Sequence, residues 1–108
     1  MVASHAIGSV PFLIQDGENG LIYENGNQRQ FEECVERVIK DSEYRKKLGV
    51  NAYESIVNVW SADIAAKRFV KMSQALLKGE SANSLFEIGP CSRANILKND
   101  WISNKKGR

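Results

Sequence analysis

The chain has 108 residues, of which 43% are hydrophobic and 26% are charged, and its formal net charge is +2 at pH 7. A chain of this length suits one small domain at most. Residues 1–79 carry ten basic and ten acidic side chains, and residues 80–108 carry five basic and three acidic ones, so neither part is basic enough to suggest a protein that binds nucleic acid.

The first elements that the pattern predicts are two short strands. Met1–Ser4 is short and apolar, which is typical of a buried parallel strand, and Leu21–Tyr23 is the second candidate. A parallel strand needs neighbours, and we expect Met1–Ser4 to be an orphan strand that lacks them. His5–Val10 is predicted to be a loop, because Gly8 lets the backbone turn closely before it meets the fixed φ of Pro11.

A tight turn is predicted between the two apolar runs of residues 11–23. Gly17 and Gly20 can both take positive φ without a Cβ clash, so we expect positive φ at both. The side chains of Asp16 and Asn19 can hydrogen-bond to their own backbone. The turn therefore brings two apolar pairs together, and these pairs are Leu13-Ile14 and Leu21-Ile22.

Three helices are predicted after the turn, each with a side chain that can cap its start. The expected caps, in chain order, are Asn27 with Gln30 as a capping box, then Asp41 or Ser42, and then Ser61. The first helix runs to about Lys40, and Gly79 ends the third. Each helix shows an apolar face at helical spacing. The predicted faces are Phe31, Cys34, Val35, Val38 and Ile39; then Tyr44, Leu48, Ala52, Ile56 and Val57; then Ile64, Ala65, Phe69, Met72, Leu76 and Leu77.

Residues 80–108 lose this periodicity and are predicted to form a partly ordered extension of loop and loose tail. Two apolar groups remain in it: Leu85 to Ile88, which can dock on a domain surface, and a short amphipathic turn. That turn contains Ile96, Leu97, Trp101 and Ile102 beside Lys98, Lys105 and Lys106. A basic end with apolar residues also suggests weak contact with an anionic membrane surface as an alternative.

Several of these features, taken in order, resemble the C-terminal end of bacterial glycosyltransferase family 4 enzymes, which have the GT-B fold. The features are Val2-Ala-Ser4, Gly8, Pro11, Leu13-Ile14, Asp16-Gly-Glu-Asn-Gly20 and the helix after Trp60-Ser61. The resemblance covers about residues 1–78. It implies an α/β fold that is mostly helical with one or two short strands, in which residues 1–79 are the C-terminal part of the second Rossmann-like, donor-binding domain.

The resemblance also implies a function for the parent protein. It is a retaining glycosyltransferase that moves a hexose from a nucleotide-sugar to a glycan or lipid-linked acceptor, with no cofactor and no metal. The donor-binding signature of the family, two glutamates separated by seven residues, is expected just before Met1. Glu24 and Glu32 have this spacing but straddle a turn and a helix start, so we do not assign them that role. We expect the chain alone to be inactive and to carry no catalytic residue.

Ser4, His5 and Gly8 are the candidate substrate-binding residues, because the resemblance places this loop at the interdomain cleft and ligands bind at the ends of parallel strands. Main-chain N–H groups around Gly8 can approach phosphate or sugar oxygens. His5 is interpreted as an ordinary loop histidine rather than a catalytic one. Phe12 departs from the family, which usually has glutamate after this proline, and this suggests packing at that position.

The alternative interpretation is a noncatalytic helical interaction module or a truncated remnant. Cys34 and Cys91 show no paired spacing and are predicted to be reduced thiols, which is typical of a cytoplasmic protein. No apolar run reaches the length of a membrane span. The expected location is therefore the cytoplasm, with a peripheral position on the inner face of the membrane as a variant. Self-association is expected through the apolar faces of Met1–Ser4 and of the helix 61–78.

Overall fold

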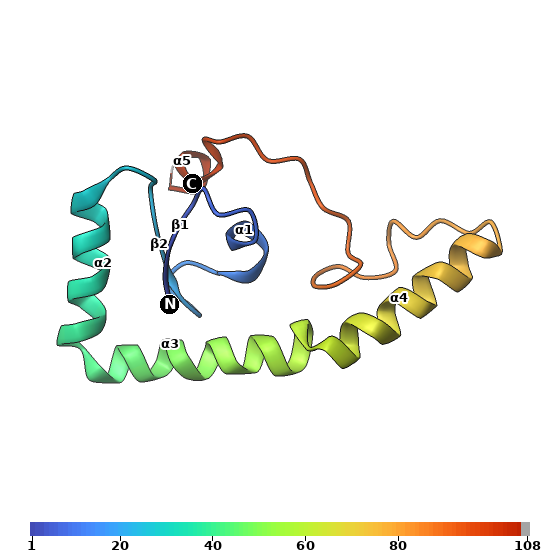
Figure 1. Cartoon of the computed structure of the whole chain (residues 1–108), viewed down its shortest axis with the longest axis horizontal. Helices are drawn as coiled ribbons and strands as arrows, with labels where there is room; N and C mark the ends of the chain where they lie inside the picture. The colour runs from blue at the N-terminus through green and yellow to red at the C-terminus, as the bar shows by residue number, and fades with distance from the viewer. Residues whose placement is uncertain (107–108) are drawn as a thin grey trace. The chain divides into compact units, whose positions relative to one another are not determined.

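The computed structural model describes the backbone of residues 1–106 and the side chains of residues 1–103. It divides into two compact units, residues 1–53 with 96–106 and residues 54–95 (Figure 1). The elements are β1 (Val2–Ser4), α1 (Val10–Leu13), β2 (Leu21–Tyr23), α2 (Gln28–Lys40), α3 (Ser42–Ser55), the π-helix η1 (Ile56–Trp60), α4 (Ala62–Leu77) and α5 (Trp101–Lys106). The described chain is mostly helical with a small parallel sheet, as predicted. The domain boundary expected at residue 79 stays a prediction.

The sheet consists of β1 and β2, which pair in parallel with Ala3 opposite Ile22. The amide of His5 extends the ladder by donating to the Tyr23 carbonyl at 2.9 Å, and Leu21 donates to the Met1 carbonyl at 2.8 Å. The prediction of an orphan strand is therefore wrong, because the crossover through α1 is long enough to return β2 to the side of β1.

The turn before β2 is held by two side chains that bond to the backbone. Asp16 Oδ1 accepts from the Ile22 amide at 2.8 Å, and Asn19 Oδ1 accepts from the Gln15 amide at 2.7 Å. The Asn19 Nδ2 group also donates to the Leu13 carbonyl at 3.0 Å. These bonds confirm the prediction that Asp16 and Asn19 bond to local backbone, and they satisfy polar groups that would be costly to leave unpaired.

The two glycines of this turn are needed for different reasons. Gly17 has a φ of +84°, as predicted, which is the left-handed region that β-carbons disfavour. Gly20 does not have positive φ, so that part of the prediction is wrong. Instead, a Cβ added at Gly20 would lie 3.0 Å from Ile14 Cγ2 and 3.1 Å from the Met1 carbonyl oxygen. Gly20 is required because β1 and the apolar core approach it closely.

The core of the first unit gathers apolar side chains from the sheet, α1 and the C-terminal segment. Its buried members are Ala3, Val10, Ile14, Ile22 and Ile102, with Leu13 and Trp101 packed against them. The expected contact between the apolar pairs on either side of the turn is thus present in Ile14 and Ile22. Helix α1 was not predicted. Its first residue, Val10, is buried, and Pro11 occupies its first turn, where the missing N–H of proline costs no hydrogen bond.

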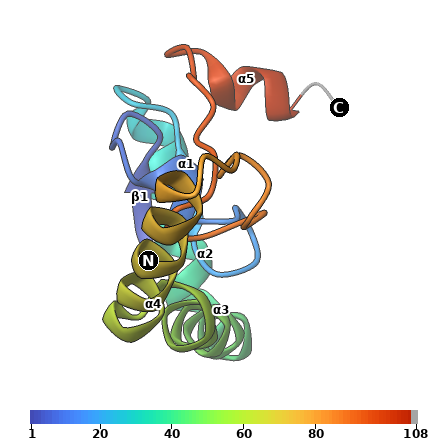
Figure 2. The same cartoon turned by 90° about the vertical axis from the view of Figure 1, so that its right-hand side faces the viewer.

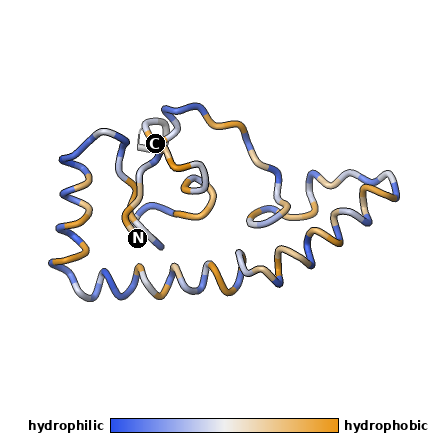
Figure 3. The backbone as a smooth tube through the Cα atoms, in the orientation of Figure 1, coloured by the Kyte–Doolittle hydropathy of each residue, from blue (hydrophilic) through white to orange (hydrophobic). Residues whose placement is uncertain are grey.

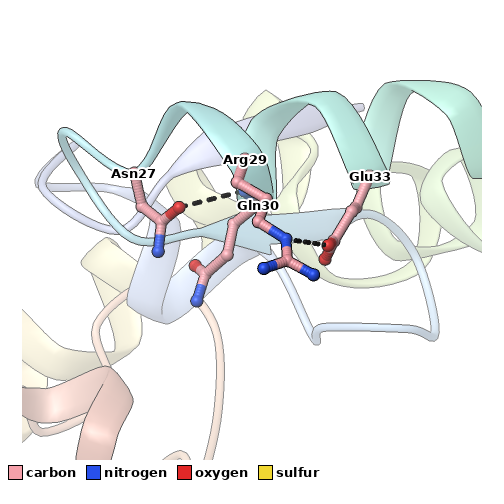
Figure 4. Close-up of polar contacts among 4 residues, drawn as sticks. All are labelled: Asn27, Arg29, Gln30 and Glu33. Atoms are coloured by element: carbon pink, nitrogen blue, oxygen red, sulfur yellow. Dashed lines mark hydrogen bonds and ion pairs between the residues drawn. The ribbon is translucent and has the colours of Figure 1, made fainter.

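Helix α2 begins at the predicted cap. Asn27 Oδ1 accepts from the Gln30 amide at 3.0 Å, and Arg29 in the same first turn pairs with Glu33 of the next turn at 3.0 Å (Figure 4). The capping box is not reciprocal, since Gln30 Oε1 accepts from the Glu24 amide at 2.8 Å. The side chain of Gln30 thus ties the end of β2 to the start of α2.

The other two predicted caps are also present. Asp41 Oδ1 accepts from the Tyr44 amide at 2.9 Å at the start of α3, and Ser61 Oγ accepts from the Ile64 amide at 3.2 Å at the start of α4. The helix that begins at α3 does not stay regular up to Ser61, because its last turn widens into η1. The spacing of apolar residues does not indicate where a π-helix forms, so η1 was not predicted.

Gly79 ends α4 as predicted, with a φ of +75°. Its amide donates to the Leu76 carbonyl at 3.0 Å, and the Glu80 amide donates to the Ala75 carbonyl at 3.0 Å. This pair of bonds is the Schellman arrangement, in which a left-handed residue satisfies the last carbonyls of the helix.

The predicted apolar faces of the helices are covered only in part. Leu48 is buried at 2% exposure, but Ile39 is 68% exposed and Leu77 is 88% exposed. Ile56, Val57, Phe69 and Leu76 are also exposed. These side chains stay exposed because, within the described residues, no second layer covers these faces.

The structure predicts opposite effects for alanine at three glycines. Gly17→Ala should destabilise the chain by about 1–2 kcal/mol, because it puts a Cβ into the left-handed region. Gly20→Ala should cost about 1–3 kcal/mol through crowding against Ile14 and Met1. Gly49→Ala is the control, because Gly49 lies inside α3 with no atom within 4 Å of an added Cβ, and it should stabilise by about 0.5–1 kcal/mol. Urea or thermal unfolding of the three variants measures these shifts, and equal melting of all three would contradict this account of the turn.

Candidate functional site

The predicted site lies where the two parallel strands end. β1 ends at Ser4 and β2 ends at Tyr23, and these two residues are paired in register. The loops that follow the strands therefore leave the sheet at the same edge, where α/β sheets commonly bind ligands. Ser4 is the last residue of β1, and His5 and Gly8 belong to the loop that follows it.

Ser4 is buried, with 8% of its surface exposed. Its hydroxyl donates to Asn25 Oδ1 at 3.3 Å and accepts from the Ala6 amide at 3.2 Å. The side chain thus fastens the loop after β1 to the turn after β2. In this arrangement Ser4 shapes the site rather than presenting a free hydroxyl.

His5 is also buried, with 7% exposure, and it lies in the loop after β1 as predicted. Its Nδ1 accepts from the Asn25 amide at 2.8 Å, and its Nε2 lies 3.0 Å from the Asn99 carbonyl. These partners assign the neutral tautomer with the proton on Nε2. Both ring nitrogens are occupied by main chain, so the geometry favours a positioning role over proton transfer.

The C-terminal segment reaches this loop through Trp101. The indole Nε1 donates to the His5 carbonyl at 3.2 Å, and the two rings lie with centroids 6.2 Å apart. Ile102 beside it is buried in the core, while Ile96 is fully exposed. Two of the four apolar residues of the expected amphipathic turn are therefore packed inward. The side chains of Lys105 and Lys106 lie outside the described residues.

Gly8 is exposed, and no atom lies within 4 Å of a Cβ added there. It lines an open pocket of about 390 Å³ between the loop after β1 and residues 97–101. Phe12 lines the same pocket and is 47% exposed, so the packing expected at this position is only partial. The amides of Gly8 and Ser9 make no hydrogen bond within residues 1–106. The pocket thus combines apolar side chains with main-chain donors.

Asn25, Asn99 and Trp101 are site residues that the sequence did not indicate. Asn25 lies in the turn after β2. The sequence indicated that turn, but it did not indicate the contact between Asn25 and His5. Asn99 and Trp101 lie 94 and 96 residues from His5, and a contact of that separation leaves no periodic pattern. Only the apolar character of Trp101 hinted that the segment docks.

A second open pocket, of about 500 Å³, lies between the turn and α2. Its lining includes Asp16, Glu33, Cys34 and Arg37. The Arg37 guanidinium lies 4.2 Å from the ring centroid of Tyr44, whose hydroxyl donates to the Gly17 carbonyl at 3.3 Å. These contacts connect α2, α3 and the turn.

The remaining titratable groups do not form a catalytic cluster within the described residues. Glu24 and Glu32, which share the family spacing, are both exposed, and Glu32 accepts from Gln28 Nε2 at 2.8 Å. On α2, hydrogen bonding and attraction by Lys40 lower the pKa of the exposed Glu36 carboxyl. Cys34 and Cys91 form no disulfide.

The part of the chain that the structure describes has neither a candidate metal centre nor a candidate membrane span. No group of three or more histidine, cysteine, aspartate or glutamate side chains there is placed to hold a metal ion. No helix there is long and apolar enough to cross a membrane.

The family model for glycosyl transferases group 1 matches residues 1–55. The chain belongs to this family. The matched residues include both strands, the turn held by Asp16 and Asn19, and the loop with Ser4, His5 and Gly8. Comparisons with curated proteins and with solved structures give no match. The family therefore places the candidate loop in a glycosyltransferase chain, while its ligand contacts stay a prediction.

The bonds of His5 predict how the C-terminal segment of this glycosyltransferase chain responds to mutation. His5→Phe keeps a buried ring but leaves the Asn25 amide and the Asn99 carbonyl without partners, which should cost about 1–3 kcal/mol. The Trp101 indole proton should then exchange faster with solvent, as measured by nuclear magnetic resonance. Phe12→Leu, at a half-exposed position in the same pocket, is the control and should leave that exchange unchanged. An indole proton equally protected in both variants would contradict the role given to His5.

Proposed function

We propose that this chain is part of the donor-binding domain of a bacterial family 4 enzyme. In this proposal the parent is a retaining glycosyltransferase that moves a hexose from a nucleotide-sugar to a glycan or lipid-linked acceptor in the cytoplasm. The observation that carries the proposal is the match of residues 1–55 to glycosyl transferases group 1. The donor sugar, the acceptor class and the retaining outcome come from the resemblance of the Ala-Ser strand and the Asp-Gly-x-Asn-Gly turn to that family.

Within this proposal the loop 5–9 faces the donor. Its exposed residue Gly8 offers a main-chain N–H with no partner within residues 1–106, and such N–H groups bind phosphate oxygens well. Ser4 and His5 are bonded to Asn25 and Asn99, so they hold the loop in place instead of touching the reacting atoms. Preorganised donors of this kind cost little rearrangement when charge develops on a leaving group.

The 108 residues do not by themselves supply the groups that the reaction needs. The facing domain and the segment in which the family carries its paired glutamates lie outside the 108 residues. Positioning of two substrates provides much of the rate enhancement of such transfers. The isolated chain therefore contributes scaffold and one loop of the donor site.

Because it supplies only one loop of the donor site, the 108-residue chain should show no measurable sugar transfer and should bind nucleotide-sugars only weakly. Isothermal titration calorimetry with UDP-glucose and GDP-mannose measures the affinity. We expect dissociation constants weaker than about 1 mM, equivalent to less than about 4 kcal/mol of binding free energy. Micromolar binding would show that the chain holds a complete donor site, and it would contradict the claim that the chain supplies only part of that site.

The role of the loop can be tested in a working enzyme. In a characterised group 1 glycosyltransferase, residues 1–55 replace the matching segment, and the chimera is assayed for transfer. Gly8→Asp in this chimera puts a negative charge beside the donor phosphates and should raise the KM for the nucleotide-sugar at least about fivefold, from repulsion at about 4 Å in a solvated site.

Val50→Asp is the matched control, because Val50 is half-exposed on α3 and does not line the pocket beside Gly8. It adds the same charge away from the loop and should leave the KM unchanged. Equal KM values for the two variants would contradict a donor contact at Gly8. A chimera that folds but transfers no sugar would count against the proposed function itself.

A further inference from the structure

The pocket that Gly8 lines carries charge of one sign. Among the described residues that line it, Lys98 is the only one with a charged side chain, and no aspartate or glutamate takes part. His5 also lines the pocket, but its ring is neutral, because Nδ1 accepts a hydrogen bond from the Asn25 amide. The pocket therefore combines one cation with the main-chain N–H of Gly8.

The rest of the pocket is largely apolar. Its walls include the side chains of Pro11, Phe12, Leu97 and Trp101. Walls of low dielectric focus the field of a charge into a cleft, so a single cation there attracts an anion more strongly than it would on a flat surface. The volume of about 390 Å³ lies within the range of small-molecule sites, which is about 300–1,000 Å³. These properties suit a small anionic group.

The main chain around Lys98 is attached to the loop that contains Gly8. The Lys98 carbonyl accepts from the Trp101 amide at 3.1 Å, and the Asn99 carbonyl lies 3.0 Å from His5 Nε2. The Trp101 indole donates to the His5 carbonyl at 3.2 Å. Within the first unit, Figures 1 and 2 show α5 at the end of β1 from which this loop departs. Only the side chain of Lys98 therefore has to be ordered when a ligand binds.

The ammonium group of Lys98 has no carboxylate partner among the described residues. The ion pairs found there join Arg29, Lys40 and Lys67 to carboxylates on their own helices. Asp100 is close to Lys98 in sequence but does not line the pocket. Lys98 is exposed, and in Figure 3 the stretch just before α5 has hydrophilic colour. The charge of Lys98 is thus available to an anion.

We propose that Lys98 binds the diphosphate of the nucleotide-sugar together with the main-chain N–H of Gly8. This inference rests on the proposed function, and it adds a residue from outside the segment 1–55 that the family model matches. The group that an ammonium and an amide recognise together is a phosphate, because hydrogen bonds to a charged acceptor are the strong ones. The donor carries two adjacent phosphates, which can engage both groups at once.

Titration of the 108-residue chain with sodium pyrophosphate, followed by nuclear magnetic resonance, tests the proposal without any sugar transfer. Millimolar pyrophosphate should shift the Gly8 amide and the Lys98 ε-methylene signals with one dissociation constant. Lys98→Gln should weaken that constant about fivefold or more, which is the effect of one unit charge at about 4 Å in water. Lys98→Arg keeps the charge and should bind as the unchanged chain does. An unshifted Trp101 indole signal in both variants shows that the C-terminal segment stays docked.

Lys46→Gln is the matched control, because Lys46 is an exposed lysine on α3 that does not line the pocket. It removes the same charge and should leave the dissociation constant unchanged. Equal weakening by Lys46→Gln and Lys98→Gln, or a Gly8 amide that does not respond to pyrophosphate, would overturn the proposal. Neither result depends on the transfer assay of the chimera, so failure of this inference is distinguishable from failure of the proposed function.

A second titration distinguishes the donor from a phosphorylated acceptor as the source of the phosphate. UDP-glucose should shift the same two signals, and Lys98→Gln should weaken its binding as it weakens that of pyrophosphate. Methyl phosphate, which represents an acceptor with one phosphate, should bind more weakly than UDP-glucose by about fivefold or more, because it brings less charge to the pocket. Binding of methyl phosphate as tight as that of UDP-glucose would assign the pocket to an acceptor phosphate and would overturn the donor assignment.

Discussion

The turn of residues 15–20 is the constraint on which the first unit depends. Two side chains there replace the backbone partners that a sharp reversal removes: Asp16 accepts from Ile22, and Asn19 bonds to both Gln15 and Leu13. With these groups satisfied, the apolar residues on either side of the turn can be buried without an unpaired amide. The turn thereby sets β2 beside β1. The loop after β1 leaves the sheet at a fixed edge as a consequence, and that loop is the candidate site.

Much of this first unit could be predicted from sequence because its signals are local. Asp16, Asn27 and Asp41 all accept from amides within six residues, and Gly17 takes the left-handed backbone that its own turn requires. In the second unit the same holds for the cap Ser61 and for Gly79 at the end of α4. Side chains that compete for nearby backbone groups are favoured at such caps and turns for the same reason. The family match covers this region, residues 1–55, and does not extend over α4.

The parts that sequence did not predict depend on distant residues. His5 is held by Asn99, 94 residues away, and the need for glycine at position 20 comes from Met1 and Ile14. The partial covering of α4 depends on where residues 85–90 dock, which involves two of their carbonyls accepting from Arg68, and helical periodicity alone does not give that information. The candidate site shows the same limit: Ser4 and His5 were chosen as candidates because they lie at the end of a strand, but their hydrogen-bond partners Asn25 and Asn99 were not predicted. A contact between distant segments is specified by packing, which leaves no fixed spacing in the chain.

The central claim is that the Asp16 and Asn19 side chains fix the turn and through it the sheet, and hydrogen exchange tests it most directly. The amides of Ile22 and Gln15, bonded to those side chains, should be protected together with the His5 amide that bonds to β2. Because they open as one cooperative unit, these three should share a single exchange free energy, the largest in the chain. Exchange of the Ile22 amide as fast as that of exposed amides in residues 93–98, while the His5 amide stays protected, would show that the sheet does not depend on the turn.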